Sequence, residues 1–290
     1  MLSYILTAII ALLNGTTSLS EKAWQRKTMG LGNNTGLFLI IMSACSMLIF
    51  SIMAGFDLRV NAVTIIYAIL YAADALMSIS LTFIAISRMN LITYSVFSSC
   101  KTVLVWVFGI LFMKESADIS SVISALLFTA SVLLPLFYVR GGKTKLSGYF
   151  IGLASTFVGA FGILLLKFYA KSPQKSADSV LCFYTNLFML LFMVLFMLLS
   201  PKNRPKLKDF SGVKYVFLFI PLCTIASNVA SVLQLSIMKT MPVSHFSVLI
   251  AALNCIVVFI NSKVIFREAC RMLEVCCLIL STAAVIISVL

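Results

Sequence analysis

Lys101 is the residue whose type and position most directly suggest chemistry. It lies near the middle of an apolar run from Leu91 to Met113. A lysine at the centre of a bilayer costs at least ~2.5 kcal/mol and usually has a functional role. Tyr94, Ser98 and Lys101 are spaced by four and three residues, so a helix places them on one stripe. An ammonium with two hydroxyls can bind an anionic or polar molecule, and we predict that the stripe faces a cavity.

Asp74 is the second charge deep inside an apolar run, the one from Ala62 to Ser87. This run precedes that of Lys101, and consecutive membrane helices are antiparallel, so we expect both charges at a similar depth. Two interpretations stay open. The charges form a structural ion pair, or one of them binds a charged substrate while the other reduces its field.

Asparagines inside apolar runs are further candidates for substrate contacts. Asn254 follows Lys101 at an offset of 153, which is also the offset between two matching segments of the chain, so we expect the two residues to face one another. A buried amide also forms hydrogen bonds between helices, and this alternative stays open. The predicted substrate-binding residues are Lys101, Tyr94, Ser98, Asp74, Asn254, Asn186 and Asn14.

Groups for catalysis or metal binding are sparse. The single histidine, His245, lies near the beginning of a run, and no H-E-x-x-H motif occurs. Asp74 is the only deep carboxylate, because Glu115 and Glu268 lie at the ends of runs beside basic residues. The eight cysteines include no C-x-x-C pair and are interpreted as small apolar helix residues. We predict no enzyme, no metal site and no cofactor.

The composition is typical of a membrane protein. Hydrophobic residues make up 61% of the chain, charged residues 11%, and the mean hydropathy is +1.10, whereas soluble domains are about 45 to 50% apolar. Most of the basic residues behind the net charge of +13 lie between apolar runs, where they suit lipid head groups. We predict a lipid bilayer and a small-molecule metabolite as partners, no nucleic acid, a monomer or homodimer, and the plasma membrane as location.

Ten apolar runs divide the chain, and each is near the ~20 residues that cross a bilayer. They are Leu2 to Leu19, Gly36 to Ala54, Ala62 to Ser87, Leu91 to Met113, Ile119 to Val139, Gly148 to Leu166, Val180 to Ser200, Tyr215 to Met238, Val243 to Phe266 and Met272 to Leu290.

The two halves of the chain repeat one another. A stripe of small residues recurs at an offset of 144, from Ala8, Ala11, Gly15 and Ser18 to Gly152, Ser155, Gly159 and Gly162. Such stripes let membrane helices pack closely. We predict an all-α membrane protein of ten transmembrane helices, arranged as five-helix repeats over residues 1–139 and 148–290 with a basic loop at 140–147. Five helices per repeat invert the second half, as in many secondary transporters.

The chain resembles the drug/metabolite transporter superfamily of EamA-like proteins. The resemblance rests on the ten runs, the two halves, the segment from Asn14-Gly15 to Lys22, and Glu115 closing the fourth run. It implies cytoplasmic termini. The distribution of lysine and arginine between the runs instead favours both termini outside.

A segment of the third and fourth runs resembles the nucleotide-sugar transporters. It comprises Phe83 to Ser87 followed by Thr93-Tyr94, Val96 and Lys101. The resemblance implies that Tyr94 and Lys101 contact the base or the phosphate. The second half departs from the pattern, with Met238 to Pro242 in place of a charged run and Asn254 opposite Lys101.

We therefore predict a secondary-active or exchange transporter that moves a small polar or anionic metabolite by alternating access. A nucleotide-sugar antiporter is the first alternative. A membrane scaffold or lipid scramblase that does not transport a metabolite is the second, and in that protein Asp74 and Lys101 form a structural pair.

Overall fold

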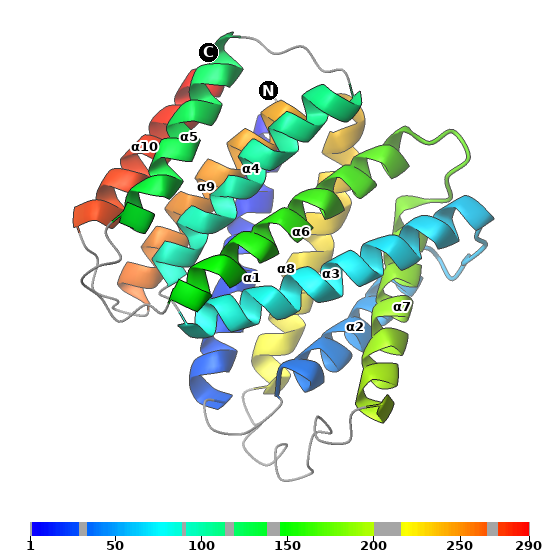
Figure 1. The fold of residues 1–290 in the computed structure, drawn as a ribbon. Coiled ribbons are helices and arrows are strands. Elements are labelled where there is room, and N and C mark those ends of the chain that lie inside the picture. Colours follow the sequence, from blue (N-terminus) through cyan, green and yellow to red (C-terminus); the bar gives the residue numbers. More distant parts are fainter. Residues whose placement is uncertain are drawn as a thin grey trace.

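The computed structural model describes residues 2–28, 34–88, 91–113, 119–137, 146–199, 216–265 and 272–289. Within these ranges the chain forms helices and no strand, which confirms the all-helical fold class (Figure 1). The helices are α1 (Leu2–Thr28), α2 (Asn34–Met53), α3 (Ala62–Arg88), α4 (Leu91–Met113), α5 (Ile119–Phe137), α6 (Leu146–Lys171), α7 (Asp178–Leu199), α8 (Val216–Thr240), α9 (Val243–Val264) and α10 (Met272–Val289).

Two helices extend well beyond the ends of the apolar runs that predict them. The first run ends at Leu19, but α1 continues to Thr28, and α6 continues beyond Leu166 to Lys171. The segment after Leu19 is rich in Glu, Lys, Ala, Gln and Arg, which favour helix although they are not apolar. Hydropathy therefore underestimates these helices. The predicted connection at 140–147 lies mostly outside the described residues.

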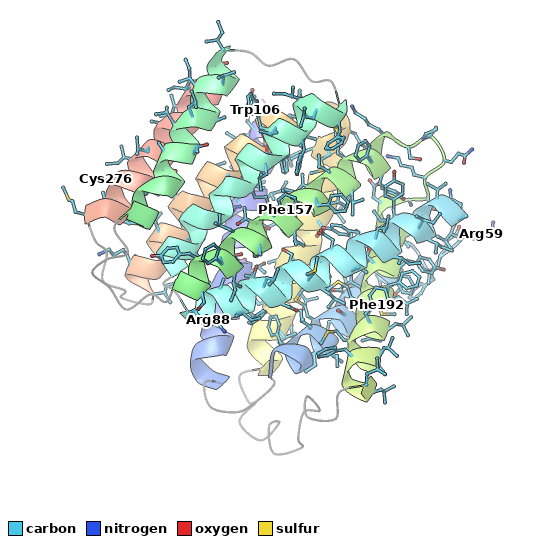
Figure 2. The ribbon with its side chains drawn as sticks, viewed as in Figure 1. Arg59, Arg88, Trp106, Phe157, Phe192 and Cys276 are labelled. Atoms are coloured by element: carbon cyan, nitrogen blue, oxygen red, sulfur yellow. The ribbon has the colours of Figure 1, made fainter. Side chains whose placement is uncertain are left out.

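Four helices contain segments long and apolar enough to cross a membrane, which indicates a membrane protein. These segments are Ala62–Ala85 of α3, Ser147–Lys171 of α6, Asp178–Phe196 of α7 and Ile220–Thr240 of α8, while the other six helices have shorter apolar segments within the described residues. The outer face of α6 carries Phe150 and Phe157, which are 65% and 56% exposed. Figure 2 shows Phe157 among the side chains that cover the bundle. Such an exposed apolar face suits lipid.

Helices from the two halves alternate through the bundle. α1 packs against α8 and α9, α3 against α6 and α7, and α4 against α6 and α9. α5 pairs with α10 at one edge, and α2 pairs with α7 toward the opposite edge (Figure 1). The centre is therefore formed by α1, α3, α4, α6, α8 and α9.

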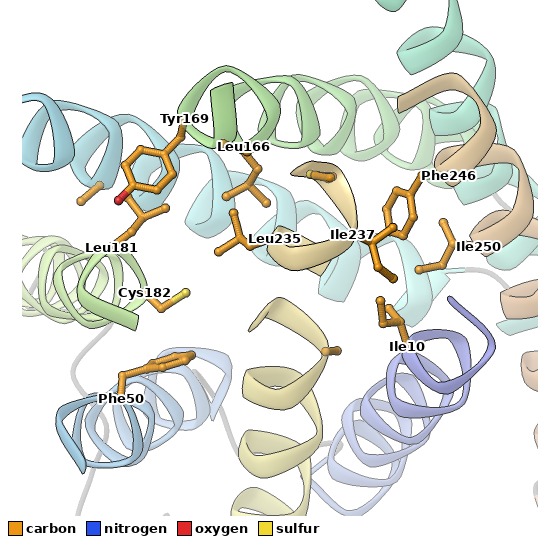
Figure 3. Close-up of a cluster of buried hydrophobic side chains, with 14 of the residues drawn as sticks. Ile10, Phe50, Leu166, Tyr169, Leu181, Cys182, Leu235, Ile237, Phe246 and Ile250 are labelled. Carbon is orange, nitrogen blue, oxygen red and sulfur yellow. The ribbon is translucent and has the colours of Figure 1, made fainter. Parts of the chain in front are cut away.

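A buried apolar cluster joins five of the central helices, α1, α3, α6, α8 and α9, to α2 and α7 (Figure 3). Close packing is the main force between helices in lipid, because the surroundings are equally apolar. The largest buried side chains of the cluster are Ile10, Phe50, Tyr169, Leu181, Leu235 and Phe246.

One end of the bundle is held by three hydrogen bonds, two of which join the two halves. The Tyr169 hydroxyl of α6 donates to the Ser176 carbonyl at 2.8 Å. The Ser176 N–H donates to Thr64 Oγ1 at 3.0 Å, and the Asn61 N–H donates to Ser176 Oγ at 3.3 Å. Asn61 and Thr64 lie at the start of α3, so these bonds hold α3 and the α6–α7 connection together.

Candidate functional site

A cavity of about 260 Å³ lies where the six central helices meet. Asp74 is twelve residues from the start of α3, and Lys101 is ten residues from the start of α4, so both are near the middle of the bundle. The polar lining includes Asn14 of α1, Asp74 and Ser78 of α3, Lys101 of α4, Gln234 of α8 and Asn254 of α9. Four residues predicted from the sequence, Asn14, Asp74, Lys101 and Asn254, thus surround one cavity.

Two glycines of α6 make room for the two charges. A Cβ atom at Gly159 would lie 3.2 Å from Cδ and 3.4 Å from Nζ of Lys101. A Cβ atom at Gly162 would overlap Oδ2 of Asp74. Positions three residues apart lie on one face of a helix, about 5 to 6 Å from each other. α6 therefore holds the ammonium and the carboxylate as neighbours along the cavity wall.

Asp74 and Lys101 form no direct ion pair in the part of the chain that the structure describes. The ion pairs found there join Arg59 to Asp57 at 3.7 Å and Lys239 to Asp178 at 2.5 Å. The Asp74 side chain lies in a residue that is only 8% exposed, and its charge and that of Lys101 attract one another through space. A direct ion pair is one of the two interpretations that the sequence leaves open, and it is not formed among the described residues. Both side chains instead line the cavity.

Asn254 brings an amide to the cavity from α9. Its Oδ1 is buried and has no hydrogen-bond partner among the described residues. An unsatisfied buried acceptor costs about 1 to 3 kcal/mol, so a donor on a bound molecule would relieve it. The Asn254 Oδ1 atom therefore forms no hydrogen bond between helices within the described residues.

A second, smaller cavity of about 120 Å³ adjoins the central one. It lies between α2, α3, α7 and α8, and Tyr71, Ala75 and Ile79 of α3 line both cavities. Asn186 lines the second cavity, not the central one, and its Nδ2 donates to the Cys182 carbonyl at 2.8 Å. Asn186 is therefore separated from the other predicted site residues by α3.

Two buried polar atoms of the second cavity are unpaired within the described ranges. They are Thr185 Oγ1 and Asn228 Nδ2. The Asn228 side chain is fixed at its other atom, because its Oδ1 accepts a hydrogen bond from Ser46 at 3.0 Å. The second cavity thus presents neutral hydrogen-bonding groups, in contrast to the charges of the central cavity.

Tyr94 is not part of the cavity lining that the structure describes. Its hydroxyl lies 2.7 Å from Thr82 Oγ1 and 3.5 Å from Ser155 Oγ, so it joins α3, α4 and α6. Lys101 follows Tyr94 by seven positions, which corresponds to about 10 Å along a helix. The side chains of Ser98 and His245 lie outside the described residues, as do Glu115 and Glu268.

Lys167 of α6 is a second buried lysine with different surroundings. It is 3% exposed, and its Nζ donates to the carbonyls of Met238 and Met241, each at 2.8 Å. These carbonyls lie at the end of α8, which finishes at Thr240. The last carbonyls of a helix lack partners within the helix and favour a nearby cation. Lys167 therefore caps the carboxyl-terminal end of α8.

The fold matches that of a solved protein. The crystal structure of a protein superposes with a TM-score of 0.66, covering 96% of this chain and 96% of its own, at 16% sequence identity. No family model matches the sequence. No curated protein matches it either. At this identity the structural likeness establishes the fold alone.

The predicted site residues do not include Ser78, Gln234, Gly159 and Gly162, which also line the central cavity, although Gln234 is a polar residue inside an apolar run. The two glycines belong to the repeated small-residue stripe, which the sequence assigns to helix packing. In the structure they face the Lys101 and Asp74 side chains. The available signal was the spacing of three residues between glycines in a chain with two deep charges.

Proposed function

We propose that the chain is a secondary transporter that binds a small anionic metabolite at Lys101 and moves it across the membrane by alternating access. The observation that carries the proposal is the central cavity, which is enclosed by three helices of each half and holds a lysine without a direct protein partner among the described residues. A site between two halves suits a mechanism in which one half rocks against the other.

In this proposal the protein lies in the plasma membrane and crosses it with ten helices, which form two inverted repeats. Replacing each helix by the one five places away converts α1–α8 into α6–α3, α4–α6 into α9–α1, and α3–α7 into α8–α2, and all of these are packed pairs. The pairs α2–α7, α4–α9 and α5–α10 convert into themselves. This correspondence supports a two-fold relation between the halves, and five helices per half give them opposite orientations.

The lining suggests the chemistry of the substrate. The Lys101 ammonium suits a carboxylate, a phosphate or a sulfate group. Asn14, Gln234 and Asn254 offer amides that both donate and accept hydrogen bonds, which suits hydroxyl groups on the same molecule. Asp74 balances the charge of Lys101 when no substrate is bound, and its carboxylate repels a bound anion unless the carboxylate is neutralised on binding.

Thermal unfolding of the purified protein with and without ligands tests this proposal. The panel holds nucleotides, nucleotide sugars, amino acids and sugar phosphates. A ligand at 100 times its Kd stabilises the folded state by about 2.7 kcal/mol, which raises the Tm. We expect an anionic member to raise the Tm of the wild-type protein and not that of Lys101→Met. A panel without any shift that depends on Lys101, or unchanged uptake by Lys101→Met in proteoliposomes, would reject the proposal.

A nucleotide-sugar antiporter is the second candidate, and the second cavity favours it. A nucleotide combines a phosphate with a neutral, hydrogen-bonding base, and the adjoining cavities combine Lys101 with the unpaired atoms of Thr185 and Asn228. We expect Asn228→Leu to weaken nucleotide binding and to leave the binding of sugar phosphates unchanged. Equal losses for both classes would count against this candidate.

A further inference from the structure

Asp74 is a buried acid whose role the binding of an anion leaves unexplained. Its residue is 8% exposed at mid-helix, it lines the cavity beside Lys101, and in the described ranges it has no direct ion-pair partner. Oδ2 of Asp74 packs against Gly162 of α6, and any side chain at position 162 would overlap it. The carboxylate is thus held in the cavity but apart from the lysine.

The charge balance of the cavity changes when a substrate enters. When the cavity is empty, one carboxylate and one ammonium give no net charge. A bound monoanion leaves one negative charge in excess, in surroundings where an uncompensated charge is expensive. Repulsion between the anion and Asp74 favours addition of one proton to the carboxylate.

The groups around Asp74 leave few alternatives for this proton. Among the described residues, the titratable or charged groups that face it are Tyr71 on its own helix and Lys101 on α4, with Cys182 of α7 beyond Tyr71. α1 and α6 contribute Asn14 and Gly162, which do not titrate. Lys101 is occupied by the anion, so Asp74 is the group that accepts the proton.

We propose that Asp74 is a proton-binding site and that one proton enters with each monoanion bound at Lys101, so that the protein is a proton–anion symporter. In the loading step, a proton from water binds a carboxylate oxygen of Asp74 as the anion pairs with the Lys101 ammonium. Release on the other side returns both to water and restores the two charges. This inference rests on the proposed function and adds the coupling ion.

Proton uptake during anion binding tests the inference directly. Methanesulfonate is a suitable probe because its charge is constant between pH 5 and pH 8. We expect the purified full-length protein to take up one proton per bound methanesulfonate, measured with a pH-indicator dye in weak buffer. In the pH range where Asp74 is ionised in the empty protein, the Kd of methanesulfonate should fall about tenfold each time the pH is lowered by one unit. Asp74→Asn should bind without proton uptake and with a Kd independent of pH.

Matched variants separate the possible failures. Asp57→Asn removes an exposed acid outside the cavity and should behave as the wild type. Binding that depends on Lys101 but takes up no proton, or the same uptake by Asp74→Asn, would overturn the symport and leave the proposed function standing. Absence of binding that depends on Lys101 would overturn both. The wild-type proton stoichiometry decides the question even if Asp74→Asn does not fold.

Discussion

Lys101 and Lys167 are both lysines inside apolar helices, yet their surroundings differ. Lys167 donates to two carbonyls at the end of α8. Lys101 lies against Gly159 and opens to the central cavity, without an ion-pair partner in the part of the chain that is described. The comparison teaches that a deep lysine alone does not mark a site. The feature that supports a site at Lys101 is that its ammonium lines a cavity and has no ion-pair partner among the described residues.

The largest effect on stability is expected for Lys167→Met. It leaves the carbonyls of Met238 and Met241 without this donor, and each unsatisfied group costs about 1 to 3 kcal/mol. We expect the free energy of unfolding to fall by about 2 to 6 kcal/mol in denaturant titrations of the purified protein. Lys171→Met, at the exposed end of the same helix, is the control. Equal stability of the two variants would show that the hydrogen bonds of Lys167 contribute little.

Lys101→Met should have the opposite profile. A hydrogen bond to a charged group contributes about 1.5 to 3 kcal/mol, so anion binding should weaken by about one to two orders of magnitude. The free energy of unfolding should change by less than about 1 kcal/mol, because removal of a charge without a contact partner relieves its desolvation. Calorimetric titration and denaturant unfolding measure the two quantities, and Lys263→Met on the exposed surface of α9 is the control.

The scaffold and scramblase alternatives predict a different result for the same variant. If Asp74 and Lys101 are a structural pair, each single replacement destabilises the fold, and Asp74→Asn with Lys101→Met restores it. A stable single variant without anion binding would separate the transporter from these alternatives.

Gly162→Ala tests how closely α6 approaches the charges. The new methyl group would overlap Oδ2 of Asp74, and such overpacking costs about 1 to 3 kcal/mol. Gly159→Ala should cost less, because its nearest atoms are Cδ of the flexible Lys101 side chain and Oγ of Ser78, each at 3.2 Å. Denaturant unfolding of the two variants gives the comparison. A larger loss for Gly159→Ala would mean that Lys101 is held more rigidly than Asp74.

The sequence predicts the helical class and four residues of the central cavity, because apolar runs and deep charges are local features. Asn14, Asp74, Lys101 and Asn254 are deep polar residues, and they meet in one place. The sequence does not predict which helix separates two polar groups, so it places Asn186 in one site with residues that lie beyond α3. It also assigns the α6 glycines to packing alone, because their role depends on side chains that arrive from α3 and α4.

The smallest effect is expected for Tyr94→Phe. This variant tests whether Tyr94 binds the substrate together with Lys101 or only joins α4 to its neighbouring helices. Sequence reasoning makes Tyr94 a substrate contact, whereas its hydroxyl lies 2.7 Å from Thr82 Oγ1. Loss of one such hydrogen bond costs about 0.5 to 1.5 kcal/mol. We expect unfolding to become easier by that amount and anion binding at Lys101 to stay unchanged, with Tyr4→Phe as the control on α1, where the residue is 44% exposed. Weaker anion binding without a loss of stability would show that Tyr94 contacts the substrate. A hydroxyl that only joins helices contributes to the free energy of unfolding and not to ligand binding.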